Sequence, residues 1–270
     1  MIKEGDWVIF SLKGSKKDKD WLRQIFHEKS LETHLGSIKF SDVIGKPYGT
    51  EIKHGQGILV FLEPRLDRLL ANMPHATNII YEDDAAIMSF KANIKRGQRV
   101  LEIGSGSGGL TLYLSTLLYV SEKENTSQKP IVSVDINPIH QKKAKENIER
   151  FGFEHLVDFR CGNILSDSIL EENDIETFDA VLIDIPTPWD LLGPIKPYIK
   201  SGKSIVIFVP NWAQIEKTVE IAEETNYHVV EVFEIFRRPM VVDTKKHITR
   251  PITRAIIYSG VLIHLIRLTD

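Results

Sequence analysis

The chain has 270 residues, of which 42% are hydrophobic and 26% are charged, and its formal net charge is −3. The length suits one large α/β domain plus a small extra domain, or a single long domain, and the composition is ordinary for a soluble globular protein. It contains no uncharged apolar run of about 18 residues, so we expect no membrane span. The polar start argues against a signal peptide, and the single cysteine, Cys161, excludes an intramolecular disulfide and a cysteine-rich metal site. A cytoplasmic protein is the simplest interpretation.

The first part of the chain is predicted to form a small β-rich domain. Residues Asp6–Leu12 and Gly57–Leu62 are rich in the β-branched and aromatic side chains that favour strands. Several glycines between these runs indicate turns. A short helix over Pro64–Asn72 would lead out of this domain, which we place at residues 1–75.

In the following domain, placed at residues 76–270, apolar runs alternate with segments of helical spacing, which is typical of a parallel, doubly wound sheet. The last two β-type runs, His228–Arg237 and Ala255–Leu268, have no helix between them, so we expect an antiparallel pair at the sheet edge. The polar run Ser121–Lys129 is predicted to be a surface loop. The other expected strands are Arg99–Ile103, Ile131–Asp135, Val157–Arg160, Ala180–Ile185 and Ser204–Val209, and the expected helices are Asp84–Ala92, Thr111–Val120, Pro138–Phe151 and Trp212–Thr225.

Charge is distributed unevenly along the chain. Residues 76–234 carry 15 Lys and Arg against 25 Asp and Glu, whereas residues 235–270 carry seven against two. A basic C-terminal end is a candidate contact for phosphates, and a solvated face without a partner is the alternative. The basic residues fall mainly between the last two predicted strands, so we expect an exposed, extended loop held by Pro239 and Pro251.

The strongest functional signal is a glycine-rich turn that follows a predicted buried strand and opens a helix. Glycine permits positive φ and lets the backbone approach a ligand closely. Such a turn alone also serves dinucleotides. Two details favour a methyl donor: Glu102 lies just before the turn, and a substantial segment precedes the strand. The motif is Val100-Leu101-Glu102-Ile103-Gly104-Ser105-Gly106-Ser107-Gly108-Gly109.

Polar residues also follow the next three predicted strands. Asp135 ends the second strand, where an acid can accept hydrogen bonds from ribose hydroxyls. Asn163, in Cys161-Gly162-Asn163-Ile164, could bond an adenine amino group, although Gly-Asn is also a plain turn signal. Asp184 lies where open α/β sheets bind ligands, in Asp184-Ile185-Pro186-Thr187-Pro188-Trp189, and Trp189 offers a stacking face for a base.

Together these residues resemble the tRNA (adenine-N1) methyltransferases that act at position 58 of the T-loop, and in archaea also at position 57. The resemblance covers nearly the whole chain and implies an α/β fold: a seven-stranded class I, Rossmann-like methyltransferase sheet with a small N-terminal β-rich domain. Where the family usually has Tyr-Pro-Lys-Asp, this chain has Tyr81-Glu82-Asp83-Asp84. The similar segments are Thr33–Ile38, Asp42–Thr50, Leu66–Pro74, Ile80–Ala86, the glycine turn and Asp184–Trp189.

The resemblance implies an enzyme that binds S-adenosyl-L-methionine and tRNA, forms a homotetramer and needs no metal. Asp184 and Tyr81 would be catalytic, because attack by N1 of adenine requires positioning and charge stabilisation rather than a strong general base. The expected tRNA contacts are Trp189, Arg237, Arg238, Lys245 and Lys246. The expected cofactor contacts are Ile80, Glu102, Gly104, Gly106, Ser107, Gly108, Gly109, Asp135, His140, Asn163, Ile164 and Asp184.

Two alternatives share the same motifs. One is a class I methyltransferase with a protein or small-molecule acceptor. The other is a non-catalytic tRNA-binding subunit of a methyltransferase complex, against which the intact glycine turn, Asp135 and Asp184 argue. An NAD-dependent oxidoreductase is a weaker third reading, because it gives the Asp184–Trp189 segment no role.

Overall fold

The computed structural model describes residues 1–13, 20–77, 80–119, 128–244, 246–253 and 258–269. The chain divides into two compact units, Met1–Met73 and Pro74–Asp270. The boundary lies two residues before the one that the sequence predicts. No helix among the described residues is long and apolar enough to cross a membrane. Most of the predicted Ser121–Lys129 loop lies outside the described residues, so it stays a prediction.

The N-terminal unit contains an antiparallel four-stranded sheet in the order β2-β1-β6-β5 and a separate hairpin, β3–β4. Its core is aromatic: Phe10 stacks on Phe40 with ring centroids 5.7 Å apart and meets Phe61 edge-on at 5.4 Å. A cluster of this kind gives a small sheet one well-packed face. The elements are β1 (Trp7–Leu12), β2 (Asp20–Gln24), β3 (Ser30–Thr33), β4 (Gly36–Lys39), η1 (Phe40–Asp42), β5 (Glu51–His54), β6 (Gly57–Leu62) and α1 (Leu66–Ala71).

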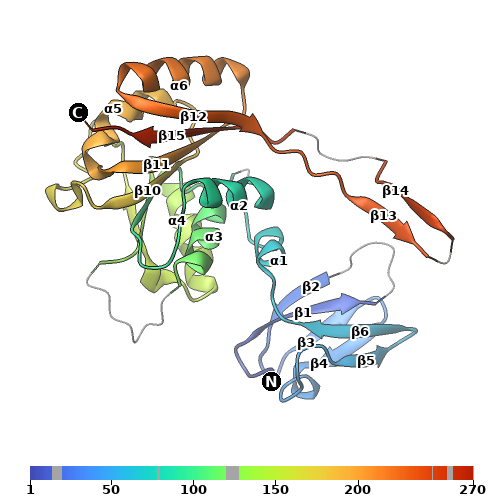
Figure 1. Cartoon of the computed structure of the whole chain (residues 1–270). Helices are drawn as coiled ribbons and strands as arrows, with labels where there is room; N and C mark the ends of the chain where they lie inside the picture. Colours follow the sequence, from blue (N-terminus) through green and yellow to red (C-terminus); the bar gives the residue numbers. More distant parts are fainter. Residues whose placement is uncertain (14–19, 78–79, 120–127, 245, 254–257, 270) are drawn as a thin grey trace. The chain divides into compact units, whose positions relative to one another are not determined.

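The second unit is built on a seven-stranded sheet in the order β12-β15-β11-β10-β7-β8-β9 (Figure 1). The five neighbouring strands β11, β10, β7, β8 and β9 run parallel to one another. Strand β15 pairs antiparallel with both β11 and β12. This confirms the predicted parallel sheet with an antiparallel pair at one edge. The strands are β7 (Val100–Ile103), β8 (Ile131–Asp135), β9 (Val157–Cys161), β10 (Phe178–Ile183), β11 (Ile199–Val209), β12 (Tyr227–Glu234) and β15 (Val261–Arg267).

Helices cover both faces of this sheet, with α2, α3 and α4 on one face and α5 and α6 on the other (Figure 1). The start of α4 follows the sequence prediction: the Asn137 side chain accepts a hydrogen bond from the Ile139 amide, and Pro138 takes the first helical position. The helices are α2 (Glu82–Lys91), α3 (Gly109–Leu117), α4 (Pro138–Arg150), η2 (Glu154–Leu156), η3 (Glu172–Asp174), η4 (Pro188–Leu191), α5 (Leu192–Ile195), η5 (Lys196–Tyr198) and α6 (Trp212–Glu224).

The connection between β12 and β15 corrects one prediction. It contains a β-hairpin, β13 (Met240–Asp243) and β14 (Ile248–Pro251), rather than an extended loop (Figure 1). The loop prediction rested on the basic residues and the two prolines, whereas β-branched side chains beside them, such as Val241 and Val242, favour strand pairing. Apolar side chains of this hairpin stay exposed, including Met240 and Val242.

The sheet topology determines where polar strand-end residues meet. Because β7, β8, β9 and β10 are parallel, their carboxyl ends lie at one edge. Asp135 is the last residue of β8, and the glycine turn, Asn163 and Asp184 come directly or two residues after the ends of β7, β9 and β10. Open α/β sheets bind ligands at this edge.

Candidate functional site

A cavity of about 610 Å³ lies at the carboxyl edge of the central strands. Its walls come from the loops after β7, β8, β9 and β10, which the sequence pattern singled out. Among the described residues that line it there is no lysine or arginine, and His140 is the sole basic side chain. The lining residues are Thr77, Ile103, Gly104, Gly106, Val134, Asp135, Ile136, Asn137, His140, Gly162, Asn163, Ile164, Leu165, Asp184, Ile185, Pro186, Thr187, Asp190 and Leu191.

The glycine turn holds the floor of this cavity in a conformation that other residues rarely adopt. Gly104 has φ +100°, and a Cβ there would lie 2.2 Å from the carbonyl oxygen of Asp184. Gly108 has φ +85°, and a Cβ there would lie 3.0 Å from Cα of Ala144 in α4. The first glycine therefore brings β7 and β10 together, and the second lets α3 approach α4.

Asp135 connects the glycine turn to the start of α4. Its Oδ2 accepts a hydrogen bond from the Gly106 amide at 2.8 Å, and its Oδ1 accepts one from the Asn137 amide at 2.8 Å. His140 lies beside it, with Nδ1 4.0 Å from Oδ1. Each carboxylate oxygen has a second lone pair, so this acid can still accept hydrogen bonds from two ligand hydroxyls.

Glu102 lies beneath the turn rather than in the cavity wall. It is fully buried, and its Oε2 accepts hydrogen bonds from the hydroxyls of Thr111 and Ser133, both at 2.6 Å. Ser133 in turn lies 2.6 Å from the hydroxyl of Ser105. Burial raises the pKa of Glu102 to about 7, although the two hydroxyl donors oppose this shift. The residue ties β7, β8 and α3 together.

Asp184 places a carboxyl group in the cavity wall at the end of β10. Its amide donates to the Ile103 carbonyl oxygen at 2.9 Å, which fixes the backbone against β7. Burial and then the charge of Asp84 raise the pKa of Asp184 to about 6. A carboxylate with a raised pKa is a stronger hydrogen-bond acceptor than an ordinary one, and such groups concentrate at functional sites.

The loop after β9 supplies the apolar part of the wall. Ile164 and Leu165 line the cavity, as does Ile136 from the loop after β8. The Asn163 side-chain oxygen accepts a hydrogen bond from the Leu165 amide at 3.0 Å. The combination of an apolar slot, Asp135 and a close glycine turn suits a nucleoside, and the acidic lining suits a cationic centre. These residues therefore fit S-adenosyl-L-methionine, which carries both.

Comparison with protein families assigns the chain. Residues 57–257, well over half of the sequence, match the model of the family described as the tRNA methyltransferase complex GCD14 subunit. The chain belongs to this family. A curated relative is the tRNA (adenine(57)-N(1)/adenine(58)-N(1))-methyltransferase TrmI of Methanocaldococcus jannaschii, which is 27% identical over 250 residues covering 84% of each protein.

Solved structures agree with this assignment. The tRNA (m1A58) methyltransferase TrmI of Aquifex aeolicus superposes with a TM-score of 0.79 and 25% identity, over 100% of this chain and 99% of that one. A SAM-dependent O-methyltransferase of Thermotoga maritima reaches a TM-score of 0.85 at 23% identity, over 100% and 95%, and supports the fold alone. The predicted class I methyltransferase sheet with a small β-rich N-terminal unit is confirmed.

Several residues predicted to bind the cofactor, and the predicted catalytic residue Tyr81, are not among the residues that line the cavity. Ile80 is buried next to α2, and Tyr81 is an exposed residue at the start of that helix. The Ser107 hydroxyl accepts hydrogen bonds from the amides of Ala76 and Thr77 at 2.8 and 3.0 Å. Gly108 and Gly109 start α3 behind the turn. Gly104, Gly106, Asp135, His140, Asn163, Ile164 and Asp184 do line the cavity.

Two predicted tRNA contacts have protein partners. The ammonium group of Lys217 in α6 lies 4.4 Å from the ring centroid of Trp189, so one face of this indole is covered. Arg237 contacts both acids that depart from the usual family pattern: its guanidinium lies 2.9 Å from Glu82 and 3.0 Å from Asp83. The departure thus comes with an ion-pair network between α2 and the hairpin connection.

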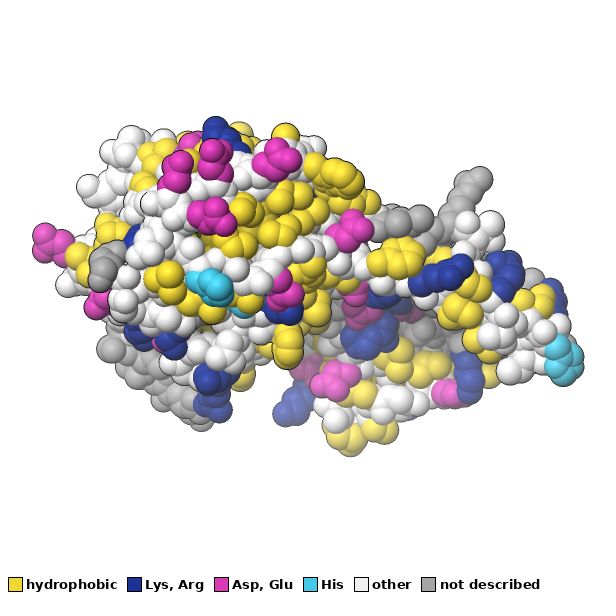
Figure 2. Space-filling view, turned by 45° about the horizontal axis from the view of Figure 1, so that its top comes forward, with side chains coloured by type: hydrophobic (Ala, Val, Ile, Leu, Met, Phe, Trp, Pro, Cys, Tyr) yellow, Lys and Arg dark blue, Asp and Glu magenta, His cyan; other side chains and the backbone are white. Residues whose placement is uncertain are grey.

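The remaining basic candidates lie on the connection between β12 and β15: Arg238 precedes β13, and Lys245 and Lys246 come between β13 and β14 in the sequence. Arg238 and Lys246 are exposed, whereas Lys245 lies outside the described residues. Figure 2 shows dark blue side chains along this hairpin, while acidic side chains predominate over the α6 side of the sheet. The basic C-terminal part of the sequence and its acidic middle part therefore lie on different surfaces of this unit.

Sequence analysis did not single out several wall residues. Thr77 precedes the first helix of the unit, Ile136 follows Asp135, and Asp190 belongs to η4. These residues could have been predicted from the sequence, because each lies near a predicted strand-end motif or a predicted helix. Asp84, which acts on Asp184 through its charge, carries no such signal, because it is near Asp184 only in the folded chain.

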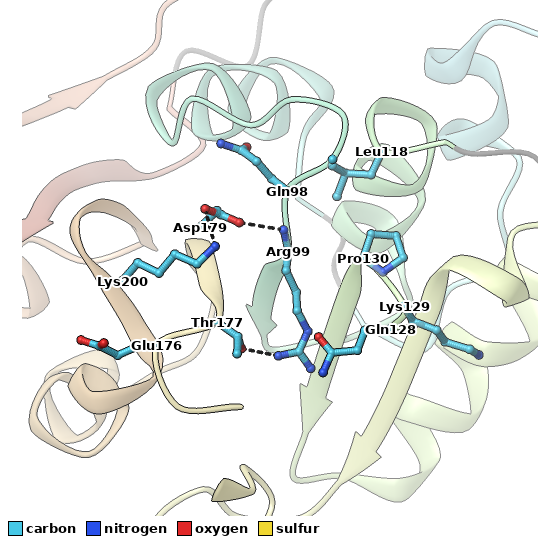
Figure 3. A pocket seen from close by; sticks show the side chains of 11 residues that line it. Gln98, Arg99, Leu118, Gln128, Lys129, Pro130, Glu176, Thr177, Asp179 and Lys200 are labelled. Carbon is cyan, nitrogen blue, oxygen red and sulfur yellow. Dashed lines mark hydrogen bonds and ion pairs between the residues drawn. The ribbon is translucent and has the colours of Figure 1, made fainter. Parts of the chain in front are cut away.

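A second cavity, of about 390 Å³, lies at the opposite edge of the sheet (Figure 3). Its charged groups are already paired: Arg99 contacts Asp174 and Thr177, and Asp179 accepts from Lys200 at 2.9 Å. The amino ends of the strands are not where such sheets bind ligands. The strand-end cavity is therefore the candidate active site.

Proposed function

We propose that this protein transfers a methyl group from S-adenosyl-L-methionine to N1 of an adenine in the T-loop of tRNA, at position 58 or at both 57 and 58. Membership of the family and the named activities of its relatives support this proposal. The observation that carries it is the carboxyl group of Asp184, held in the wall of a nucleoside-sized cavity next to the glycine turn.

When bound, S-adenosyl-L-methionine supplies an electrophilic methyl group on a cationic sulfur. Asp135 would hold the ribose hydroxyls, and the slot of Ile136, Ile164 and Leu165 would exclude water around the adenine ring. Gly104 and Gly106 carry no side chains, so the rest of the S-adenosyl-L-methionine molecule would fit against the backbone there.

The acceptor is an adenine ring whose N1 lone pair needs no deprotonation, so the protein has to orient the base and stabilise the charge that develops on it. Asp184 would accept a hydrogen bond from the exocyclic amino group, which both orients N1 and offsets the new positive charge. Tyr81 would shape the entrance on the side of α2. An adenine buried in the T-loop must first be extruded, and Trp189 would help to hold it by its uncovered face.

A homotetramer is part of the proposal. The hairpin β13–β14 exposes Met240, Val242 and Ile248 together with basic side chains. Apolar residues on a projecting hairpin favour burial against another copy of the chain. Four copies would also bring together several basic hairpins for one tRNA. We place the protein in the cytoplasm, consistent with its single cysteine, Cys161, which needs no disulfide partner.

The experiment is nucleoside mass spectrometry of unmodified tRNA after incubation with the protein and S-adenosyl-L-methionine. Formation of 1-methyladenosine at position 58, or at 57 and 58, is the expected result. The same reaction with a protein extract tests a protein acceptor. Donor binding by calorimetry without any tRNA methylation would instead favour a different acceptor, and absence of donor binding would favour a non-catalytic tRNA-binding subunit.

A further inference from the structure

Asp84 is a buried carboxylate to which the sequence motifs assign no role. It is the third residue of α2 and is only 1% exposed. Its Oδ1 accepts a hydrogen bond from the Ser259 hydroxyl at 3.1 Å, whereas its Oδ2 is buried and has no hydrogen-bond partner among the described residues. A buried charged oxygen without a partner destabilises the folded state, so its presence calls for an explanation.

The fold brings this carboxylate to the edge of the sheet where Asp184 lies. Ser259 comes just before β15, and because Val261 pairs with Val209, it lies beyond the carboxyl end of β11. Gly260 fixes this approach, since a Cβ there would be 2.4 Å from the ring of Phe208. Asp184 directly follows β10, the strand next to β11. Asp84, held by Ser259, and Asp184 therefore lie near the carboxyl ends of the neighbouring strands β11 and β10.

The charge of Asp84 acts on Asp184. It raises the pKa of Asp184, in addition to the larger effect of burial. Burial also raises the pKa of Asp84, the hydrogen bond from Ser259 opposes this, and the charge of Asp83 raises it further. The other titratable groups around Asp184 are acidic apart from one histidine: Glu102 beneath the turn, and Asp135, His140 and Asp190 in the cavity wall.

A purely structural role in α2 accounts poorly for this arrangement. Acidic residues near a helix N-terminus are stabilising, but an exposed one serves as well. Glu82 and Asp83 already occupy the same first turn, are more exposed, and pair with Arg237. A third acid that is buried adds a desolvation penalty which the helix itself does not require.

We propose that Asp84 is a positioning residue for methyl transfer: its fixed negative charge, held by Ser259 at the sheet edge, keeps Asp184 a strong hydrogen-bond acceptor for the amino group of the target adenine. This inference rests on the proposed function for its substrate, but the coupling of the two carboxyl groups belongs to the free protein. The Asp84–Asp184 pair leaves an excess of negative charge where a cationic methyl donor binds and a cationic base forms.

The test replaces Asp84 with asparagine, which keeps the shape and removes the charge. The Asp184 carboxyl group is titrated by NMR in the free protein labelled with ¹³C at the aspartate side chains, with Asp184→Asn identifying its signal. We expect Asp84→Asn to lower the pKa of Asp184 by about one unit, the scale of a neighbouring like charge. Ser259→Ala, which leaves the carboxylate in place but unfixed, should shift it less in the same direction.

Kinetics provide the second readout. With unmodified tRNA, Asp84→Asn should reduce kcat about tenfold, the scale seen when a supporting partner is removed. It should also move the acidic limb of the pH profile to lower pH, a shift that loss of structure would not produce. Glu231 lies on β12 and pairs with Lys91, the last residue of α2. Glu231→Gln is therefore the matched control and should leave both readouts unchanged.

Two results would overturn the inference. One is an Asp184 titration that is the same in the wild-type protein and in the Asp84→Asn and Ser259→Ala variants. The other is a reduced kcat with an unmoved acidic limb, which indicates a structural role. Failure of the proposed function would look different: the wild-type protein would not methylate tRNA, while the NMR titration would still report whether Asp84 sets the state of Asp184.

Discussion

The Gly106 amide donates a hydrogen bond to Oδ2 of Asp135 across 2.8 Å, so the glycine turn after β7 is held by the acid that ends β8. The other oxygen of the same carboxylate accepts from the Asn137 amide at the start of α4. One side chain thus organises two of the loops that form the cavity. We therefore expect Asp135 to act on a bound ligand both directly, through its free lone pairs, and indirectly, through the shape of the turn.

Replacing Asp135 with alanine should weaken S-adenosyl-L-methionine binding by about 1–3 kcal/mol, the usual cost of losing a hydrogen bond to a charged group. Asp135→Asn should also weaken binding, because its one side-chain oxygen can accept from only one of the two backbone amides, and its amide nitrogen cannot accept from the other. Isothermal titration calorimetry measures both. Asp158→Asn, on the edge strand β9 and paired with Arg160, serves as the control. Unchanged affinity in Asp135→Ala would show that the ribose binds elsewhere.

Gly104→Ala should destabilise the protein more than a change in backbone preference alone explains. The added Cβ would lie 2.2 Å from the Asp184 carbonyl oxygen, so β7 and β10 must shift apart. Gly97→Ala is the matched control: it has φ +85° but nothing within 4 Å of the added atom. We expect Gly97→Ala to cost about 1–2 kcal/mol, from the left-handed conformation alone. If chemical denaturation shows that Gly104→Ala and Gly97→Ala lose the same free energy of unfolding, the clash at Gly104 does not contribute.

Asp184 should make the folded state less stable as the pH rises. Its pKa is raised from 3.8 to about 6, so between these values the folded chain binds a proton that the unfolded chain has released. The free energy of unfolding therefore falls across this window and stays reduced above it. Asp184→Asn removes this loss. Between pH 4.5 and pH 7.5, the free energy of unfolding of the variant should therefore gain about 1–3 kcal/mol relative to that of the wild-type protein.

The same variant should lose activity. Asparagine cannot supply the negative charge, and removing one such electrostatic contact typically lowers kcat about 100-fold or more. In the wild-type protein, activity should decline as the pH falls below about 6, where Asp184 becomes protonated. Urea unfolding at the two pH values and single-turnover methylation check the two halves of the prediction. A variant that is both less stable and inactive would mean that Asp184 is structural.

The parts of the site that follow local patterns could be predicted from the sequence. The glycine turn, Asp135 and Asp184 each follow a buried parallel strand, and the parallel topology alone brings such residues to one edge. Buried β-branched runs and the Asn137-Pro138 helix start depend on neighbours in the sequence, so their positions are recovered within a few residues.

The parts that depend on distant contacts could not be predicted. Asp84 lies 100 positions before Asp184 in the chain, and its partner Ser259 lies 175 positions after it, so no spacing indicates their proximity. The cover that Lys217 places on Trp189 likewise depends on how α6 packs. The β13–β14 hairpin does have a local signal, the β-branched pair Val241 and Val242, but this run is short and lies among basic residues that favour an exposed loop.

The exposed cations of the hairpin should contribute to tRNA affinity without selecting the base. Charge reversal of Arg238 and Lys246, both exposed, should weaken tRNA binding and leave the methylated position unchanged, because phosphate contacts carry little sequence information. The dependence of binding on salt should become shallower by roughly one unit of slope per lost contact. Filter binding over a range of salt concentrations, with nucleoside mapping of the product, measures both.

Arg237 gives an internal comparison on the same connection. Its guanidinium is paired with Glu82 and Asp83, so it should release fewer counterions from tRNA than an unpaired cation. Arg237→Gln should therefore reduce the salt slope less than a single reversal at Lys246. If these two cations instead pair with acidic groups of another copy of the chain, reversal of Arg238 and Lys246 would change the oligomeric mass in light scattering and leave the salt slope as it was. That result would separate the hairpin from tRNA binding and assign it to assembly.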